Sequence, residues 1–317
     1  EFTKRGHPFR AYITIIEGCD KHCAYCVVPF TRGPERSRTA ESVLAEARRL
    51  ADGGYTEIQL LGQNVNSYRD PSPAAVSFAG LLSLVAEVSG IRRVRFTTSH
   101  PRDFRREIVE AIDSHTALCD HVHLPVQSGS NSVLERMQRN YTRREYLERI
   151  GWIRQARRPI SISTDIIVGF PGETEADFTE TLSLLDEVGY DSIFSFQYSP
   201  RPNTSALRME DAIPDEEKGR RLRVLQQKQQ EIQWQRNAVL VGTLQEVLVE
   251  GRNSRGNHNR HSGDEHSCNE QWKGRTSQNM VLNFTVPAGL EREVAAGEYC
   301  SVRVSKAGSN SLVGEAV

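Results

Sequence analysis

Three cysteines, Cys19, Cys23 and Cys26, lie within eight consecutive positions of this 317-residue chain. Three residues separate the first pair and two separate the second, so one short loop carries three thiolates. Cubane [4Fe–4S] clusters are held by cysteine thiolates. Three thiolates bind three irons and leave the fourth free for a substrate or cofactor, as at an open catalytic metal site. The cysteine spacing therefore predicts a [4Fe–4S] cluster with one open iron.

Two other uses of these cysteines are zinc binding and disulfide formation. A Cys3His zinc site would need a distant histidine, because His22 abuts Cys23 and would have to point the same way. A disulfide would leave an odd thiol, and it is disfavoured where no secretory leader is expected. Spacing and position favour the cluster over zinc. The remaining cysteines, Cys119, Cys268 and Cys300, are dispersed and receive no role.

The elements that position this loop alternate between strands and helices from residue 9 to about residue 199. The predicted strands cover 10–16, 56–61, 92–97, 121–125, 160–168 and 192–198, and the predicted helices between them cover 39–52, 78–89, 101–114, 131–139, 142–157 and 174–188. Such alternation is typical of parallel βαβ units. Six units predict an α/β fold, either a partial (β/α)6 barrel or an open six-stranded sheet. Both place their chemistry at the carboxyl ends of the strands, where the cysteine loop begins.

The remaining third of the chain has a different pattern. Residues 214–240 predict one long, Gln-rich helix with six basic side chains against one acidic side chain between 218 and 236, which is typical of a solvated linker. From residue 242 the chain is all-β, and strands at 243–250, 280–286 and 299–305 predict a small OB-like barrel. Residues 253–269 are expected to form a mobile loop. Its His258, His261, His266 and Cys268 could bind metal, but an ordinary polar loop is the simpler explanation for them.

The overall charge excludes a nucleic-acid binder that works by bulk charge, since 40 basic side chains face 41 acidic ones. Local basic segments remain at 92–106, with six basic against one acidic side chain, and at 136–158, with eight against two. We expect most of these arginines on solvated helix faces and some on a surface that follows RNA phosphates. No stretch of 18 apolar residues exists, which excludes a transmembrane helix.

The cysteine loop also carries a family resemblance. Residues 16–33, which read IEGCDKHCAYCVVPFTRG, resemble the radical S-adenosylmethionine (SAM) superfamily and, within it, the MiaB-type tRNA methylthiotransferases. Further matching strings stand at 61–66, 98–101, 124–130 and 165–173, and the C-terminal stretch is similar to the TRAM RNA-binding module. The resemblance implies a radical-SAM barrel at 1–213, a basic linker helix packing on it at 214–236, and a TRAM domain at 237–317.

The resemblance also implies an activity. SAM would be cleaved reductively at the cluster, and the resulting radical would remove hydrogen from C2 of N6-isopentenyladenosine at position 37 of a tRNA, where a methylthio group is then installed. No acid or base is assigned, because an aromatic C–H is inert to proton transfer and the cofactor supplies the reactivity. The alternatives are a sister enzyme acting on threonylcarbamoyladenosine or on a ribosomal-protein aspartate, and a non-catalytic, zinc-containing RNA-binding protein.

The candidate cofactor-binding residues lie at the predicted strand ends. By resemblance, Gly62, Gln63 and Asn64 meet the amino group of SAM and Gly169 supports its adenine; an ordinary βα turn is the alternative for the first three. Ser99, Gln127 and Ser128 suit ribose hydroxyls or substrate, and Arg139 is a candidate partner of the SAM carboxylate. Asp165 is a lone acid in an apolar strand and needs a partner. Tyr198 closes the sixth strand, where an aromatic side chain can equally be core.

The resembled family has a further N-terminal domain whose three cysteines hold a second, auxiliary Fe–S cluster, and this chain begins just before the radical-SAM loop. We therefore expect SAM cleavage but no complete methylthiolation by this chain alone. The expected partners are the anticodon stem-loop of tRNA and an external electron donor, with no membrane. A cytoplasmic monomer is expected.

Overall fold

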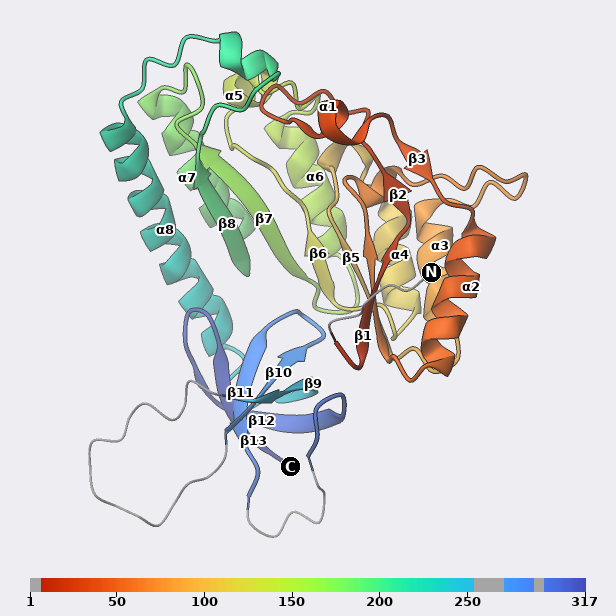
Figure 1. Cartoon of the computed structure of the whole chain (residues 1–317). Coiled ribbons are helices and arrows are strands. Elements are labelled where there is room, and N and C mark those ends of the chain that lie inside the picture. Colours follow the sequence, from red (N-terminus) through yellow and green to blue (C-terminus); the bar gives the residue numbers. More distant parts are fainter. Residues whose placement is uncertain (1–6, 254–270, 288–293) are drawn as a thin grey trace. The chain divides into compact units, whose positions relative to one another are not determined.

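Six strands pair in parallel to frame the first of two units, Glu1–Gln229. The computed structural model describes residues 7–253, 271–287 and 294–317. β1 (Arg10–Thr14), β4 (Glu57–Leu61) and β5 (Arg93–Thr97) form one sheet in the order β1-β4-β5, and β6 (His121–His123), β7 (Ser161–Val168) and β8 (Ser192–Gln197) form the other in the order β6-β7-β8. A parallel bridge between Val94 and Leu118 joins the sheets at β5. β1 and β8 are the outer strands of the two sheets, and they do not pair with each other within the described residues. The α/β prediction of an incomplete barrel is therefore confirmed (Figure 1).

Helices follow the strands and cover one side of them (Figure 1). They are α1 (Val28–Arg32), α2 (Ala40–Asp52), α3 (Phe78–Ala86), α4 (Arg106–Ser114), α5 (Asn131–Arg136), α6 (Arg143–Arg154), α7 (Glu175–Val188) and α8 (Asp215–Ala238). Local chemistry sets their starts, because Thr142 and Thr174 open α6 and α7 with reciprocal capping boxes. Gly189 ends α7 in the left-handed conformation that glycine adopts without a Cβ clash.

The strands have two different faces because successive side chains alternate. On β1 and β4, Ala11, Ile13, Ile58 and Leu60 are fully buried on the side that the helices cover. The opposite side, here called the inner face, carries Arg10, Tyr12 and Gln59 on the same strands. The apolar half of the pattern therefore builds the core, and the inner face is left to polar and aromatic side chains.

The structure corrects the predicted first strand. β1 ends at Thr14, and Ile16–Glu17 (β2) pairs antiparallel with Arg36–Ser37 (β3). The reason is a change of partner at Ile15, whose N–H still donates to Leu61 of β4 while its carbonyl accepts from Arg38, next to β3. The short ribbon β2-β3 closes the two ends of the cysteine loop.

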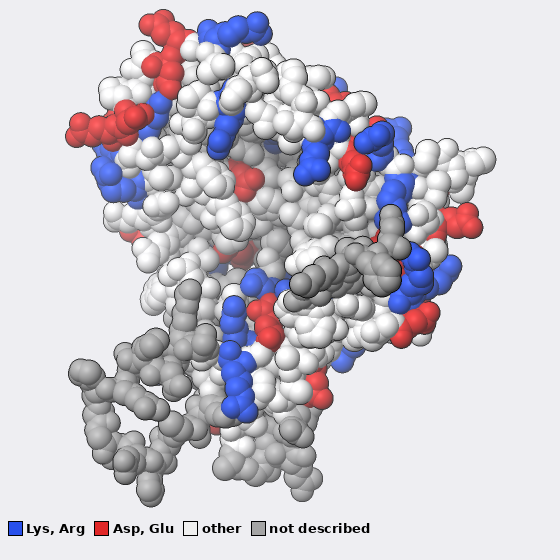
Figure 2. All heavy atoms as spheres, viewed as in Figure 1, with Lys and Arg blue, Asp and Glu red and all other residues white. Residues whose placement is uncertain are grey.

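The two basic segments follow the prediction of solvated faces only in part, since half of their arginines are exposed. Arg93, Arg95 and Arg139 are buried, and Arg95 pairs with the buried carboxylate of Glu57. Arg158 donates to the backbone carbonyls of Ile112, His115 and Leu118. These arginines satisfy internal acceptors, which composition could not reveal. On the face of this unit seen in Figure 2, Lys and Arg are interspersed with Asp and Glu.

Helix α8 is mostly polar, yet part of it is buried. Leu225 is fully buried, and Lys218, Arg221 and Gln229 are nearly so. Gln229 donates to the backbone carbonyl of Tyr190, and Gln226 donates to Ser195 on β8. Polar contacts rather than an apolar stripe hold this helix along its length within the first unit.

The second unit, Gln230–Val317, contains a closed five-stranded barrel in the order β10-β11-β13-β12-β9. The strands are β9 (Leu244–Arg252), β10 (Gln271–Thr276), β11 (Val281–Thr285), β12 (Tyr299–Ala307) and β13 (Leu312–Ala316). The predicted small β-barrel is confirmed, but β10 and β13 were not predicted, because their charged and glycine-containing sequences alternate weakly. Residues 254–269 of the predicted polar loop lie outside the described residues, and with them His258, His261, His266 and Cys268.

Within the described ranges, no helix combines the length and the apolar character needed to cross a membrane.

Candidate functional site

The cysteine loop follows β2 and is shaped by backbone contacts at Gly18. A Cβ at this position would lie 2.1 Å from the carbonyl oxygen of Pro34, so only glycine fits. The next residue, Cys19, donates its N–H to the carbonyl of Gly33, and Cys26 donates to the carbonyl of Cys23. The loop is therefore a fixed turn, held against the segment that returns through β3.

The three thiols are free, with Cys19 and Cys23 buried and Cys26 half-buried. Burial raises the pKa of Cys19 to about 11, and it also raises the pKa of Cys26. The charge of Cys23 contributes to both shifts, so Cys23 lies close enough to Cys19 and Cys26 to interact electrostatically with them. In the parts of the chain that the structure describes, no three His, Cys, Asp or Glu side chains are grouped to hold one metal ion.

Cys23 receives two N–H groups from residues far along the chain. Arg139 Nη1 lies 3.4 Å from Cys23 Sγ, and His100 Nε2 lies 4.0 Å from it. The same Arg139 donates to the hydroxyls of Tyr25 and Tyr141 and to the carbonyl of Pro125. Hydrogen bonds to ligand sulfurs tune the potential of iron–sulfur clusters. Arg139 thus lies behind the cysteine loop, while its predicted contact with the SAM carboxylate stays a prediction.

His100 is a neutral donor at this position. Burial, together with the cations Arg139, Lys21 and Arg102, lowers its pKa far below the usual range. The backbone N–H of Arg102 donates to Nδ1, which places the ring proton on Nε2, facing Cys23. In the sequence, His100 is only one residue of the string at 98–101. Its position directly after Ser99 was the one available signal of a role in the site.

Gln63 and Asn64, at the carboxyl end of β4, position the loop. Gln63 Oε1 accepts the backbone N–H of Gly18 at 2.7 Å, and Asn64 Nδ2 donates to Asp103 at 2.7 Å. Asp103 also pairs with Lys21 inside the cysteine loop at 2.9 Å. A Cβ on Gly62 would lie 2.4 Å from Cγ2 of Ile16, so the strand ends approach closely here. The predicted amino-group site therefore lies directly beside the cysteine loop.

Three buried polar atoms at strand ends have no hydrogen-bond partner in the described structure. They are Asn64 Oδ1 after β4, Ser99 Oγ after β5 and the hydroxyl of Tyr198 after β8. Burying such a group without a partner costs about 1–3 kcal/mol, so a bound polar ligand is their expected partner. The unpartnered atoms and the three thiols at one end of the strands fit a cluster together with a polar cofactor.

The other predicted residues divide into two groups. The backbone of Gln127 joins the carboxyl end of β7 through hydrogen bonds with Asp165 and Ile167, and Gly169 turns at a φ of +71° at the end of β7. Both lie at the predicted place. Ser128 instead faces the hydroxyl of Thr181 on α7 at 3.2 Å. Asp165 finds its partner on the neighbouring strand, since His123 Nε2 lies 3.4 Å from its Oδ1.

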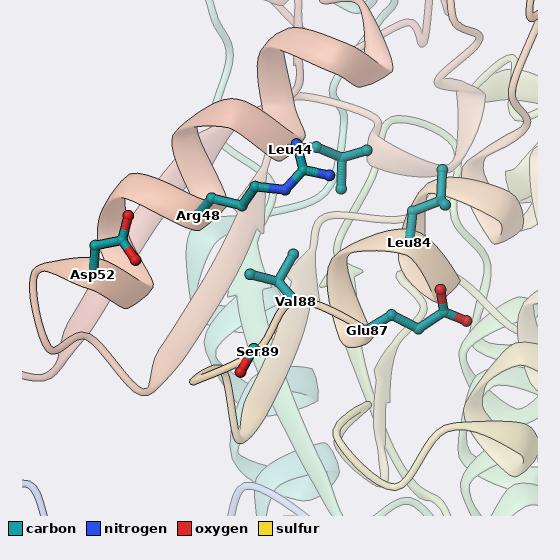
Figure 3. Close-up of a pocket in the computed structure, with 7 residues that line it drawn as sticks. All are labelled: Leu44, Arg48, Asp52, Leu84, Glu87, Val88 and Ser89. Carbon is teal, nitrogen blue, oxygen red and sulfur yellow. The ribbon is translucent and has the colours of Figure 1, made fainter.

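A surface pocket of about 430 Å³ lies apart from this site (Figure 3). Its lining residues come from α2, α3 and the turn that follows α3: Leu44, Arg48, Asp52, Leu84, Glu87, Val88 and Ser89. These are the carboxyl-terminal halves of helices that run back along the strands, so the pocket lies toward the amino ends of the strands. We assign it no part in cofactor binding.

Residues 13–185 match the sequence model of the Radical SAM superfamily. Over 314 residues the chain is 65% identical to the tRNA-2-methylthio-N(6)-dimethylallyladenosine synthase of Solibacter usitatus, and this covers 99% of the chain and 67% of that protein. The chain belongs to the radical SAM superfamily and to this synthase family. The synthase of Koribacter versatilis is 60% identical over 318 residues, which is 100% of the chain and 68% of that protein.

Solved radical SAM structures agree with the fold. The methyltransferase TsrM of Kitasatospora setae matches with a TM-score of 0.51 at 18% identity, over 62% of this chain and 38% of that chain. Coproporphyrinogen III oxidase (HemN) of Escherichia coli matches with a TM-score of 0.50 at 17% identity, over 70% of this chain and 53% of that chain. Radical SAM enzymes use a [4Fe–4S] cluster and SAM, the two cofactors that the cysteine spacing and its sequence context predicted. The chain spans about two thirds of the length of its curated relatives.

Proposed function

We propose that this chain is the radical-SAM part of a tRNA methylthiotransferase that converts N6-dimethylallyladenosine in tRNA to its 2-methylthio derivative. The identity to relatives of that name supports the substrate. The observation that carries the chemistry is the fixed loop of Cys19, Cys23 and Cys26 at the carboxyl ends of the parallel strands. When bound, the cluster would supply the electron that cleaves SAM to a radical able to attack an unreactive C–H bond.

The chain's own residues would bind and orient these groups. Cys19, Cys23 and Cys26 would hold the cluster, and Gln63 fixes the loop through the N–H of Gly18. Arg139 and neutral His100 direct N–H groups at Cys23, on the buried side away from solvent. Asn64, Ser99 and Tyr198 would direct their unpartnered oxygens at SAM. Gly62, Gln127, Ser128 and Gly169 stay candidate SAM contacts.

The partners of this reaction are part of the proposal. The single-stranded anticodon loop of a tRNA is the expected substrate, because sequence-specific RNA recognition usually targets unstacked bases in loops. An external electron donor would reduce the cluster. We further propose a monomer in the cytoplasm, with the C-terminal barrel as the RNA-holding part.

The decisive experiment is anaerobic reconstitution of the chain with iron and sulfide, followed by metal analysis and an assay with SAM. We expect a brown protein with about four irons per chain, as a cubane requires, and formation of 5′-deoxyadenosine with a reductant. Replacing any one of the three cysteines by alanine should abolish both. A colourless protein with one zinc per chain, and no 5′-deoxyadenosine, would overturn the proposal.

A further inference from the structure

The inner face of β8 carries two large aromatic side chains that the core does not use. Phe194 and Phe196 are 56% and 52% exposed. Ser195 between them contacts Gln226 of α8, so the two phenyl rings project to the opposite side of the strand, onto the inner face. The ring of Phe194 lies 5.8 Å from the ring of His123, edge to face, which places it over the neighbouring strands.

A hydrogen-bond acceptor lies beside these rings. In the parallel register Asp165 is opposite Phe194, and Ile167 is opposite Phe196. His123 holds Asp165 through Nε2 and is itself held by Ser163, whose Oγ lies 2.9 Å from Nδ1. Apart from the contact with His123, the carboxylate of Asp165 makes no side-chain hydrogen bond or ion pair among the described residues. One half-buried carboxylate is therefore aimed at a space bordered by two exposed phenyl rings.

This combination matches a substituted purine. Aromatic side chains stack on unpaired bases, and carboxylates accept from exocyclic N–H groups. An N6-alkyladenine offers a planar ring, a single N6–H and an apolar chain. A base that enters with its N6 edge toward Asp165 leaves its C2 edge for the carboxyl ends of the strands, where the cysteine loop lies.

We propose that Phe194, Phe196 and Asp165 form the site for the target base, an assignment that rests on the proposed function. Phe194 stacks on the purine, and Phe196 with Ile167 contacts the N6 substituent. Asp165 accepts the N6–H instead of contacting SAM. His123 is a positioning residue, because it acts only by holding Asp165.

Binding of synthetic anticodon stem-loops to the full chain tests this assignment without a loaded cluster. The probes carry adenosine, N6-dimethylallyladenosine or N6,N6-dimethyladenosine at the target position. We expect the dimethylallyl probe to bind most tightly. Phe194→Ala should weaken all probes about tenfold, the loss expected for one base–aromatic stack. Phe196→Ala should weaken only the dimethylallyl probe, by about tenfold, as expected for lost apolar contact.

Two further variants test the role of Asp165 and provide a control on β8. Asp165→Ala should reduce the preference for dimethylallyl over N6,N6-dimethyl, since only the former has an N6–H, and should leave the part that comes from Phe196. Ser195→Ala, on the opposite face of β8, should change no affinity. The assignment is overturned if Phe196→Ala leaves the preference intact, or if the phenylalanine variants weaken SAM binding and not RNA binding. Formation of 5′-deoxyadenosine by the reconstituted wild-type chain tests the proposed function separately, since base recognition can hold without SAM cleavage.

Discussion

The guanidinium of Arg139 donates from Nη1 to the Sγ of Cys23 at 3.4 Å, across 116 residues of chain. Burial would lower the pKa of Arg139, but Tyr141, Tyr25 and Cys23 around it raise that pKa well above its ordinary value, so it stays charged. A permanent cation therefore lies against one of the three predicted cluster ligands.

We predict that Arg139→Lys weakens cluster retention about 10- to 100-fold, the range found for residues that support metal ligands. Lysine keeps the charge but cannot contact Cys23, Tyr25 and Pro125 at once. Iron per chain during a timed chelator challenge measures the effect. Arg144→Lys, at an exposed position of α6, is the matched control. Equal iron loss from the two variants would show that the Arg139 contact has no bearing on the cluster.

The second prediction concerns Gly18. A methyl group there would meet the carbonyls of Gly33 and Pro34 at 2.5 and 2.1 Å, so the cysteine loop must shift. Gly18→Ala should abolish cluster assembly and destabilise the fold by more than the left-handed backbone alone, which costs about 1–2 kcal/mol.

Gly54→Ala supplies the control for this prediction. Gly54 has a similar φ of +85°, and a Cβ added there would have no neighbouring atom within 4 Å, so this variant isolates the backbone cost. Iron content and urea unfolding, measured for both variants, distinguish the effect of the steric clash from the cost of the left-handed backbone conformation. If Gly18→Ala still binds four irons, the loop is less constrained than its contacts indicate.

The third prediction concerns a buried ion cluster at the amino ends of the strands. Burial would raise the pKa of Glu57, but Arg95 and Arg10 lower it below its ordinary value of 4.5. A carboxyl with a lowered folded-state pKa stabilises the fold above its unfolded-state pKa and loses this contribution as the pH falls through the folded value. Glu57→Gln should therefore cost about 3 kcal/mol at pH 7, because it leaves buried arginines without their anion.

Urea unfolding at several pH values checks this expectation. The difference between wild type and Glu57→Gln should narrow as the pH falls below about 4.5, the unfolded-state value. Glu110→Gln, which removes an exposed pair with Arg106, should change stability by less than about 0.5 kcal/mol. A stability difference between wild type and Glu57→Gln that is constant from pH 7 to pH 3 contradicts the ion-pair explanation.

The fourth prediction concerns the anchor between α8 and the turn after β7. Arg221 Nη1 donates to the fully buried carboxylate of Glu173 at 2.8 Å, and Glu173 in turn accepts the N–H of Gly169 at 2.6 Å. Arg221→Met should destabilise the unit by about 3 kcal/mol, since it leaves a buried carboxylate unpaired.

A double variant identifies the cause. Adding Glu173→Gln to Arg221→Met removes the uncompensated charge and should recover more than half of the loss. Arg220→Met, at the more solvent-accessible neighbouring position whose partners are Glu175 and Glu217, should cost much less stability than Arg221→Met, because surface ion pairs contribute little. Thermal unfolding of the four proteins measures these effects. The charge argument fails if the double variant is no more stable than Arg221→Met.

By itself, the sequence determined the local features of this protein. The spacing of Cys19, Cys23 and Cys26, the alternation of strands and helices, and the turn at Gly169 follow from residues within a few positions of one another, where chain geometry leaves few choices. These features were sufficient to predict the cluster-type loop, the parallel α/β unit and the small β-barrel. The division of the first strand at Thr14 and the strands β10 and β13 depended on pairing partners that no local pattern specifies.

Tertiary structure alone decided which charges lie inside and what they contact. Arg95, Arg139 and Arg158 are indistinguishable in sequence from solvated arginines, because burial of an arginine depends on an acceptor supplied by a distant segment. Likewise, Asp165 needed a partner, but only the register of β6, β7 and β8 shows that His123 is that partner and that Phe194 lies beside it. Side chains separated by tens of residues meet only when the strands align. The tertiary structure therefore decides which side chains of the site are in contact, whereas the sequence already indicates which kinds of ligand they can bind.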